Sequence, residues 1–486
     1  MKLILIATFI FLFSYCFSQT KNFDITHKYT VREVLEDIDY TEKYLIKFHP
    51  DPFKYISKDS LLAFVVRIKS KIDTPLTEMQ IRFYLRQIVA KIGCGHTDVS
   101  NSKAYSKSIG KLNRPILPFN AFVVDTNRVF ILNNLSGDST IKAGDEILSI
   151  DHHAIPSILA RIGTIFTTDG YNQTYKKQGI KNEWFKYYYS FSYGFHTPYL
   201  LSLKHTNGTV SQYTIAAISS QKDTVMLPKR DSVNVIQKTK TCTYFLAKKD
   251  TTVAVIDVNS FGGMHWRRFM RRSFKDIKRK KITHLVIDLR DNGGGKIDNG
   301  MNLLAYLIHK PTTISFDRKP NLLPLNFRYK MNFFTRLTPL FFTASPLEFP
   351  HHWRLRHYII HLPKYRNAYH GKLSVLINGK SFSMSAIAAT YLKYKANAFI
   401  VGEETGGNIS GSNAVISGTI ILPHTKVRVF IPYYHIYHSI DVINDGHGLM
   451  PDIKTTYSAT DVLQGIDVDL NKVLEVKLFC RPSNTP

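Results

Sequence analysis

Apolar residues recur with a helical period between residues 30 and 93, and this pattern predicts a helical domain. The first helix is marked by apolar positions at Val31, Val34, Leu35, Ile38, Leu45 and Phe48. Thr30 and Thr77 each precede a Glu or Gln by three positions, the spacing of a capping box at a helix start. A further helix is expected over the apolar-rich residues 61–72. Another is expected over residues 78–92, because Gly93 then supplies a stop signal.

The pattern changes to short apolar or alternating stretches between residues 115 and 215, which predicts a β-rich domain. Two of its strands are expected over residues 121–124 and 128–132. The segment KAGDEILSIDHHAI, residues 142–155, then gives a Gly-Asp turn, an apolar strand and a second turn. His152 and His153 lie on that second turn, where we expect surface side chains and not ligands.

A rhythm of strand, helix and strand begins near residue 251 and predicts an α/β core. Residues 253–258 form a buried type of strand, residues 266–281 an amphipathic helix and residues 284–289 a second strand. That strand leads into three glycines, residues 293–295, whose backbone can approach a ligand closely and direct N–H groups at it. The spacings of phosphate-binding and dinucleotide-binding loops are absent, so the glycines alone identify no ligand.

A strand, a tight turn and a helix are predicted in succession within residues 371–411. Apolar residues 373–377 lead through the turn to three alternating serines, Ser381, Ser383 and Ser385, and small and apolar residues then continue at helical spacing. A serine at such a junction lies beside unpaired helix N–H groups and the positive end of the helix dipole, where an oxyanion is stabilised. The same serines also suit plain helix capping, which the local pattern alone favours.

Composition is that of a folded protein, because 44% of the 486 residues are hydrophobic and nothing indicates disorder. The N-terminal MKLILIATFIFLFSYCFSQ combines one lysine with a long apolar run and small residues, which predicts a signal peptide over residues 1–19, cleaved near Ser18. An uncleaved anchor and lipid attachment at Cys16 are alternatives, although the bulky Tyr15 argues against the second. The expected location is therefore the periplasm, the outer surface or the medium, and no later apolar run is long enough to span a membrane.

The charge of the chain limits the partners that we expect, and its cysteines indicate whether disulfides or a metal site are expected. The formal net charge is +27, part of it concentrated on the outer face of the predicted helix 266–281. This face is either simply solvated or is attracted to anionic lipid head groups or acidic polymers. Nucleic acid is not expected as a partner of an exported chain without a recognised binding motif. Cys94, Cys242 and Cys480, which remain after signal cleavage, are far apart and show neither a disulfide framework nor a metal-binding spacing.

Several motifs in a fixed order resemble one enzyme family. They are VIDLRDNGGG at 286–295, VLINGKSFSMSAI at 375–387 and VGEETGG at 401–407, preceded by Gly-His-Thr at 95–97. Together with the segment 142–155, which resembles the strand-turn signature of a PDZ domain, they are similar to the C-terminal processing (tail-specific) serine peptidases. The resemblance implies an α/β fold with a ClpP/crotonase-like β-α-β peptidase core, and hydrolysis of peptide bonds.

The resemblance also implies a division of the chain. After the signal peptide we expect an N-terminal helical domain over 20–110, a PDZ-like β-rich domain over 111–235 and the serine peptidase core over 236–480. A PDZ-like domain binds extended peptides by strand addition. The core contains an aromatic and basic insertion over 315–370, with aromatic residues at Phe333, Phe334, Phe341, Phe342 and Trp353. These rings are expected to line a substrate groove, to form a lid, or to be the core of an added helical hairpin.

The resemblance assigns roles to individual residues. The NGxxxS pattern of the second motif places the nucleophile at Ser383, while Ala386 stands where the family is usually acidic. The backbone N–H of Met384 and one from Gly293 or Gly294 would bind the oxyanion of a tetrahedral intermediate.

The general base separates two branches of this family. The serine-lysine branch has a lysine soon after the third motif, but this chain has Asn408 there. The other branch, similar to the tricorn core protease and to the retinoid-binding repeats of the photoreceptor matrix, supplies a histidine before the PDZ-like domain, and His96 matches it. An ordinary loop residue is the alternative for His96. The acid that orients the imidazole stays open between Asp445 and Glu404.

Two functions of different class follow. One is an exported serine endopeptidase that cleaves unfolded or C-terminally exposed polypeptides with Ser383 and His96. The other is a catalytically inactive protein on the same fold that binds a peptide or an apolar ligand. The absence of some family residues favours the binding protein. The presence of a nucleophile, a base and a glycine loop in one chain favours the enzyme. We therefore predict the peptidase. No metal or organic cofactor is implied, since HExxH is absent and acyl transfer by this route needs none.

Overall fold

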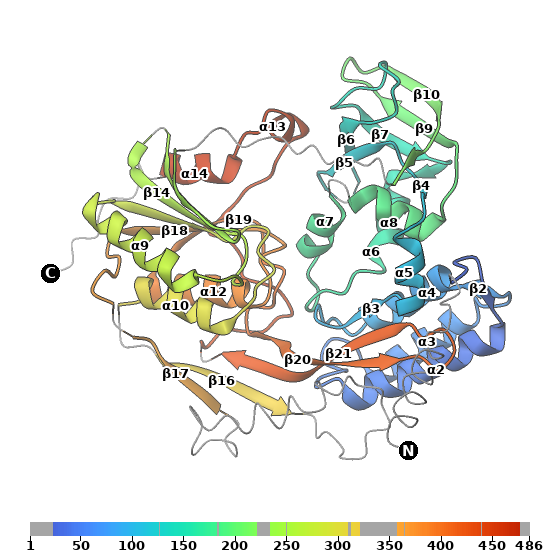
Figure 1. The fold of residues 1–486 in the computed structure, drawn as a ribbon, viewed down its shortest axis with the longest axis horizontal. Helices are drawn as coiled ribbons and strands as arrows, with labels where there is room; N and C mark the ends of the chain where they lie inside the picture. Colours follow the sequence, from blue (N-terminus) through green and yellow to red (C-terminus); the bar gives the residue numbers. More distant parts are fainter. Residues whose placement is uncertain are drawn as a thin grey trace, which may run out of the picture.

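The computed structural model describes residues 23–476, apart from 126, 182–183, 221–233, 249, 310–312, 321–356, 364 and 439. The predicted signal peptide, Cys480 and the five aromatic residues singled out in the insertion lie outside the described residues. The molecule has a core built on a seven-stranded sheet on one side and a helical unit and a second β-sheet unit on the other, joined by a long hairpin (Figure 1). None of the described helices is long and apolar enough to cross a membrane.

The N-terminal unit is helical, as the periodicity predicted. Both predicted capping boxes are present, at Thr30 with Glu33 and at Thr77 with Gln80. Its elements are β1 (Lys28–Tyr29), α2 (Val31–Phe48), α3 (Lys58–Lys69), β2 (Leu76–Thr77), α4 (Glu78–Ala90), β3 (Asp98–Ser100) and α5 (Lys103–Ile109).

The second unit is a β-sheet with three helices packed on it. The sheet has the order β10-β9-β7-β6-β5, with β8 paired to β7, so β5 lies at one end of it. The predicted turn of segment 142–155 is present, and His152 and His153 are exposed, as expected. The elements are β4 (Pro115–Ile116), β5 (Phe119–Val123), β6 (Val129–Asn134), β7 (Glu146–Ile150), β8 (His153–Ala154), α6 (Ile155–Gly163), α7 (Thr174–Ile180), α8 (Trp184–Tyr193), β9 (Tyr199–Lys204), β10 (Val210–Ile215) and β11 (Ile218–Ser219).

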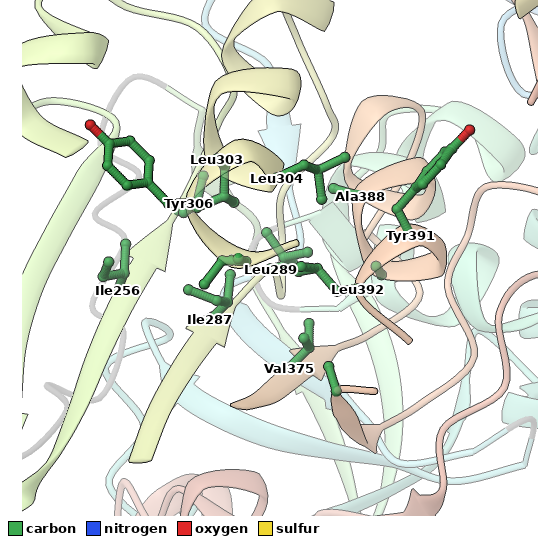
Figure 2. Packing of buried hydrophobic residues seen from close by; sticks show 14 of the residues in the cluster. Ile256, Ile287, Leu289, Leu303, Leu304, Tyr306, Val375, Ala388, Tyr391 and Leu392 are labelled. Carbon is green, nitrogen blue, oxygen red and sulfur yellow. The ribbon is translucent and has the colours of Figure 1, made fainter. Parts of the chain in front are cut away.

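The core is a seven-stranded sheet of order β12-β13-β14-β15-β18-β19-β22, in which β14 and the strands after it run parallel. Buried side chains of α9, α10 and α12 cover one face, where Leu303 and Leu304 of α10 lie over Ile287 (Figure 2). The strands are β12 (Asn234–Lys238), β13 (Cys242–Ala247), β14 (Asp250–Val258), β15 (His284–Asp288), β18 (Lys372–Ile377), β19 (Phe399–Gly402) and β22 (Ile453–Lys454). The helices are α9 (Trp266–Arg279), α10 (Ile297–Leu307), α12 (Met384–Ala396), α13 (Ala459–Leu463) and α14 (Val468–Val476).

A second sheet joins the core to the N-terminal unit. It consists of β16 (Thr313–Pro320), β17 (His357–His361), β20 (Gly411–Ile421) and β21 (Arg428–His438), and β3 pairs with the far end of β21. Apolar residues of the β20–β21 hairpin complete the core of the N-terminal helices. The residues just before β3 are therefore carried to the start of β20, at the edge of the seven-stranded core. This connection positions the site.

Candidate active site

Ser383 lies at the start of α12, after β18 and the turn that follows it. Its backbone has φ 55° and ψ −125°, a conformation that costs a residue with a side chain about 1–3 kcal/mol. Such strain is typical of a nucleophile held on a sharp turn between a strand and a helix. Ser383 is half-buried, so a substrate can reach it at the end of the sheet.

The neighbouring serines have different surroundings. The buried hydroxyl of Ser381 donates to the carbonyl of Leu289 at 2.7 Å and accepts the N–H of Asn378 at 3.0 Å. Ser385 is buried within α12. The side chain of Ser383 makes no capping hydrogen bond. The alternative in which these serines only cap the helix is therefore wrong for Ser383, which is the accessible one of the three.

The glycine loop, residues 293–295, packs directly against Ser383, the predicted nucleophile. Gly294 has a φ of +100°, and a Cβ atom at this position would lie 2.8 Å from Cβ of Ser383 and 3.0 Å from N of Met384. Only glycine fits such a position. The loop is also tied to the nucleophile segment, because the N–H of Phe382 donates to the carbonyl of Asn292 at 3.0 Å.

The predicted oxyanion donors need one correction. The N–H of Gly294 donates to Oδ1 of Asn292 at 2.8 Å, so the prediction of Gly294 as a donor is wrong. The buried amide of Asn292 also donates to the carbonyl of Val258 at 2.7 Å, and it thereby holds the loop in shape. Gly293 is exposed, and Met384 opens α12, where the N–H groups have no intrahelical partner. These two remain the predicted donors.

Arg290 anchors the end of β15 from which the glycine loop starts. Its buried guanidinium lies 2.6 Å from Asp288, 2.7 Å from Asp467 and 2.7 Å from Asp469. Charged groups buried in this way stabilise a fold only when they are fully paired. The arginine of the first motif therefore ties the loop to the C-terminal segment.

His96 comes from the N-terminal unit, between α4 and β3, and packs against the nucleophile segment. Its ring centroid lies 4.7 Å from that of Phe382, the residue before Ser383. A Cβ atom on Gly95 would lie 2.5 Å from the Phe382 ring, which explains the glycine of Gly-His-Thr. No hydrogen bond joins His96 to Ser383 within the described residues, and without substrate such bonds are often long and tighten only in the complex. The fold thus brings the segments of the predicted base and nucleophile together.

The imidazole of His96 has partners that the motifs did not identify. Its Nδ1 lies 2.9 Å from Oγ of Ser412, and this hydroxyl lies 3.2 Å from Oδ2 of Asp169. Burial lowers the pKa of His96, while the negative charge of Asp169 acts in the opposite direction. The lowered pKa favours the neutral imidazole at neutral pH, which is the form that can accept a proton.

The two predicted orienting acids lie elsewhere. Glu404 accepts the N–H of Gly448 at 2.8 Å and lies 3.1 Å from the His447 ring. Asp445 accepts the N–H of His447 at 3.0 Å within its own loop. Across the described ranges neither carboxylate contacts His96, so the prediction that one of them orients it is wrong. Both carboxylates are used by N–H groups of the loop around His447.

Neither position 408 nor Lys393 of α12 supplies a lysine base. Asn408, which stands where one branch has its lysine, donates its amide to Tyr55 at 3.1 Å and to Asn444 at 3.0 Å. Lys393 pairs with Asp452 at 2.7 Å. In the part of the chain that the structure describes, no group of three His, Cys, Asp or Glu side chains gathers as metal ligands would.

A cavity of about 240 Å³ lies between β5 of the second unit and the core. Its lining includes Phe122 and Val123 of β5 together with Asp291 and Asn378 of the first two motifs. Nζ of Lys181 lies 3.8 Å from Asp291 in this lining, and burial lowers the pKa of Lys181. The cavity therefore offers a cation and an edge strand next to the motifs.

Comparison with known proteins fits this geometry. The model of peptidase family S41 matches residues 252–455, which include the glycine loop and Ser383. Over these residues, called the S41 domain from here on, the chain is similar to peptidase family S41. The protein is a serine-type peptidase.

Solved structures show that the similarity extends beyond the S41 domain. The structure of mature CPAF complexed with lactacystin is 15% identical, with a TM-score of 0.64, over 92% of this chain and 98% of that chain. A crystal structure of mature CPAF is also 15% identical, with a TM-score of 0.64, over 92% of this chain and 97% of that chain. At this identity the likeness shows the fold alone. A comparison with curated protein sequences found no match.

Proposed function

We propose that this protein is an exported serine endopeptidase in which Ser383 is the nucleophile and His96 the general base. The S41 domain supports the hydrolytic class. One observation carries the assignment of residues: the half-buried Ser383 has the strained backbone of a nucleophile and lies between the glycine loop and the segment that carries His96. His96 takes the proton of the Ser383 hydroxyl, the oxygen attacks the peptide carbonyl, and the proton then passes to the leaving amine.

The substrates we propose are unfolded polypeptides or chains with an exposed C-terminus. Strand β5 lies at the end of its sheet, where an extended chain can add by backbone hydrogen bonds. The cavity beside β5 contains Lys181, whose ammonium suits a terminal carboxylate. Both features support a PDZ-like role for the second unit.

We also propose that the basic face of α9 contacts an anionic membrane surface after export. The apolar residues of α9 are buried as predicted, and its basic residues, among them Arg267, Arg271 and Lys275, are exposed. Met264, just before α9, is 82% exposed and adds an apolar side chain at the N-terminal end of this helix. A solvated face without a partner is the alternative.

The test is cleavage of an unfolded protein by the mature chain, with products identified by mass spectrometry. We expect cleavage by the wild type and losses of at least about 1,000-fold in Ser383→Ala and in His96→Ala, as is usual for a nucleophile and its base. Ser385→Ala is the matched control, because its hydroxyl is buried away from substrate. Activity that survives in Ser383→Ala would overturn the assignment.

A further inference from the structure

Asp169 lies where three parts of the chain meet at His96. It belongs to the second unit, between α6 and α7, and is 4% exposed. Its Oδ1 accepts the N–H of Gly95 at 2.8 Å, and its Oδ2 accepts the hydroxyl of Ser412 at 3.2 Å and the N–H of Asn408 at 3.4 Å. One carboxylate thus contacts the residue before the base, the start of β20 and the loop after the third motif.

The segment around Asp169 is held in place on both sides of the active site. The N–H of Gly170 donates to the carbonyl of Gly93 at 2.9 Å, and the N–H of Tyr171 donates to the carbonyl of Gly446 at 2.9 Å. Gly170 has a φ of +59°, and a Cβ atom there would lie 2.1 Å from the Gly446 carbonyl oxygen. The position of the Asp169 carboxylate is therefore set by the surrounding backbone and not by a flexible loop.

The chemistry of these groups fixes the direction of the hydrogen bonds. An ionised carboxylate can only accept, so the hydroxyl proton of Ser412 points to Asp169. The lone pairs of the Ser412 oxygen then face Nδ1 of His96, at 2.9 Å, and this nitrogen must carry the proton. The other ring nitrogen, Nε2, is left with a lone pair. That is the tautomer a general base needs.

We propose that Asp169, acting through the hydroxyl of Ser412, is the positioning acid that holds His96 in its base-competent tautomer. The proposal rests on the proposed function and names the residue that completes its site. During attack Nε2 takes the Ser383 proton, and the resulting imidazolium keeps its Nδ1–H bonded to Ser412. Asp169 stays ionised and stabilises that positive charge, and the proton leaves Nε2 for the departing amine.

The charge of Asp169 also has a consequence for pH dependence. Burial lowers the pKa of His96, and the negative charge of Asp169 acts to raise it. The charge of Asp169 also acts on the pKa values of Cys94, Tyr55, Tyr175 and His435. Removing the charge should therefore move the acid limb of the pH profile of kcat/KM to lower pH, because His96 then deprotonates at lower pH.

The experiment compares Asp169→Asn, Ser412→Ala and Ser412→Thr in the cleavage assay across pH. In Asp169→Asn the new amide can donate to Ser412 and reverse the hydroxyl, which favours the wrong tautomer. We expect kcat to fall about 100- to 1,000-fold with KM nearly unchanged, and the acid limb to shift downward. Ser412→Ala should lose activity without a shift of the acid limb, since the charge of Asp169 remains. Ser412→Thr should retain most of the activity, since it keeps the hydroxyl.

Asp145→Asn is the matched control. Asp145 is also buried in the second unit and lies 3.0 Å from a histidine, His205, in the sheet. The Asp145→Asn substitution should affect stability without moving the acid limb of the pH profile of kcat/KM. As a readout independent of activity, ¹⁵N spectra of ring-labelled histidine should show His96 protonated at Nδ1 in the wild type and at Nε2 in Asp169→Asn.

The outcomes separate the two proposals. If the wild type cleaves and Ser383→Ala does not, but Asp169→Asn behaves like Asp145→Asn in rate, pH profile and tautomer, only the positioning role is overturned. A shift of the acid limb in Glu404→Gln instead of Asp169→Asn would also overturn it. If the wild type itself cleaves nothing, the proposed function fails, and the ¹⁵N spectra still decide whether Asp169 sets the tautomer.

Discussion

Replacing Gly294 by alanine tests the packing of the glycine loop against the nucleophile. The added Cβ would lie 2.8 Å from Cβ of Ser383 and 2.9 Å from the carbonyl oxygen of Phe382. Carbon atoms in contact prefer a separation of about 3.5 Å or more, so the two segments must move apart by roughly 0.7 Å. Since Ser383 already has a strained backbone, it is the group we expect to move.

The magnitude follows from this displacement. A misplacement of about 1 Å can cost about 100-fold in rate, and we expect a loss of that size in kcat/KM for Gly294→Ala. The φ of +100° at Gly294 adds strain, which should lower the free energy of unfolding by about 1–3 kcal/mol. Gly293→Ala is the comparison, because no heavy atom lies within 4 Å of its added Cβ and its N–H is kept.

The assay is kcat/KM on a fluorogenic peptide, together with urea unfolding and labelling by a serine-reactive fluorophosphonate. We expect Gly294→Ala to be folded but to cleave the peptide and react with the label slowly. The loss in kcat/KM of Gly293→Ala should be at least about tenfold smaller than that of Gly294→Ala, since the added Cβ causes no clash. If Gly294→Ala retained the wild-type kcat/KM, the close packing on Ser383 would not matter for catalysis and the reasoning would be refuted.

Three further predictions concern the substrate cavity, a buried histidine and the basic helix. Lys181→Met should raise KM about tenfold for peptides with a free C-terminal carboxylate but not for their amides, because it removes a charge-assisted contact; equal effects on both would refute the role. Burial lowers the pKa of His49 to about 3, whereas a histidine in the unfolded chain has a pKa of about 6.5. Below pH 6.5 the unfolded chain therefore binds a proton that the native state does not bind. The free energy of unfolding should fall by about 2 kcal/mol between pH 7 and pH 5. Urea titrations should show a smaller loss in His49→Asn, whose amide oxygen can still accept the N–H of Asp51, and equal losses would assign the effect to other groups. Replacing Arg267, Arg271, Lys275 and Lys278 by glutamate should weaken sedimentation with anionic vesicles at least about 100-fold, at roughly 1 kcal/mol per basic residue, and unchanged sedimentation would leave α9 a solvated face.

Local sequence predicted the elements of this protein well. The capping boxes at Thr30 and Thr77 and the buried face of α9 are present as predicted. Strand β12 starts at Asn234, within the range predicted for the PDZ-like domain, but it pairs with β13 and belongs to the core sheet. These features depend on neighbours a few residues apart, so their spacing is readable in a single sequence.

The motifs also predicted Ser383, His96 and the glycine loop as site residues, because each lies on a strand end or turn with a recognisable residue pattern. They could not assign the N–H of Gly294 to Asn292, nor the backbone strain of Ser383. Both depend on how the loop after β15 packs against the start of α12. Sequence spacing gives the order of such segments but not their contacts.

The partners of the predicted base were decided by tertiary structure alone. Asp169 and Ser412 are separated by 243 positions, and Ser412 and His96 by 316. Neither Asp169 nor Ser412 belongs to a periodic pattern or a motif, and in the sequence Asp169 reads as an ordinary turn residue beside Gly170. The sequence by itself determined the helices and the strands, and it pointed to the residues that we propose carry the chemistry. The pairing of β3 with β21, which carries His96 to Ser412, decided how that chemistry is oriented, because long-range contacts leave no local signature.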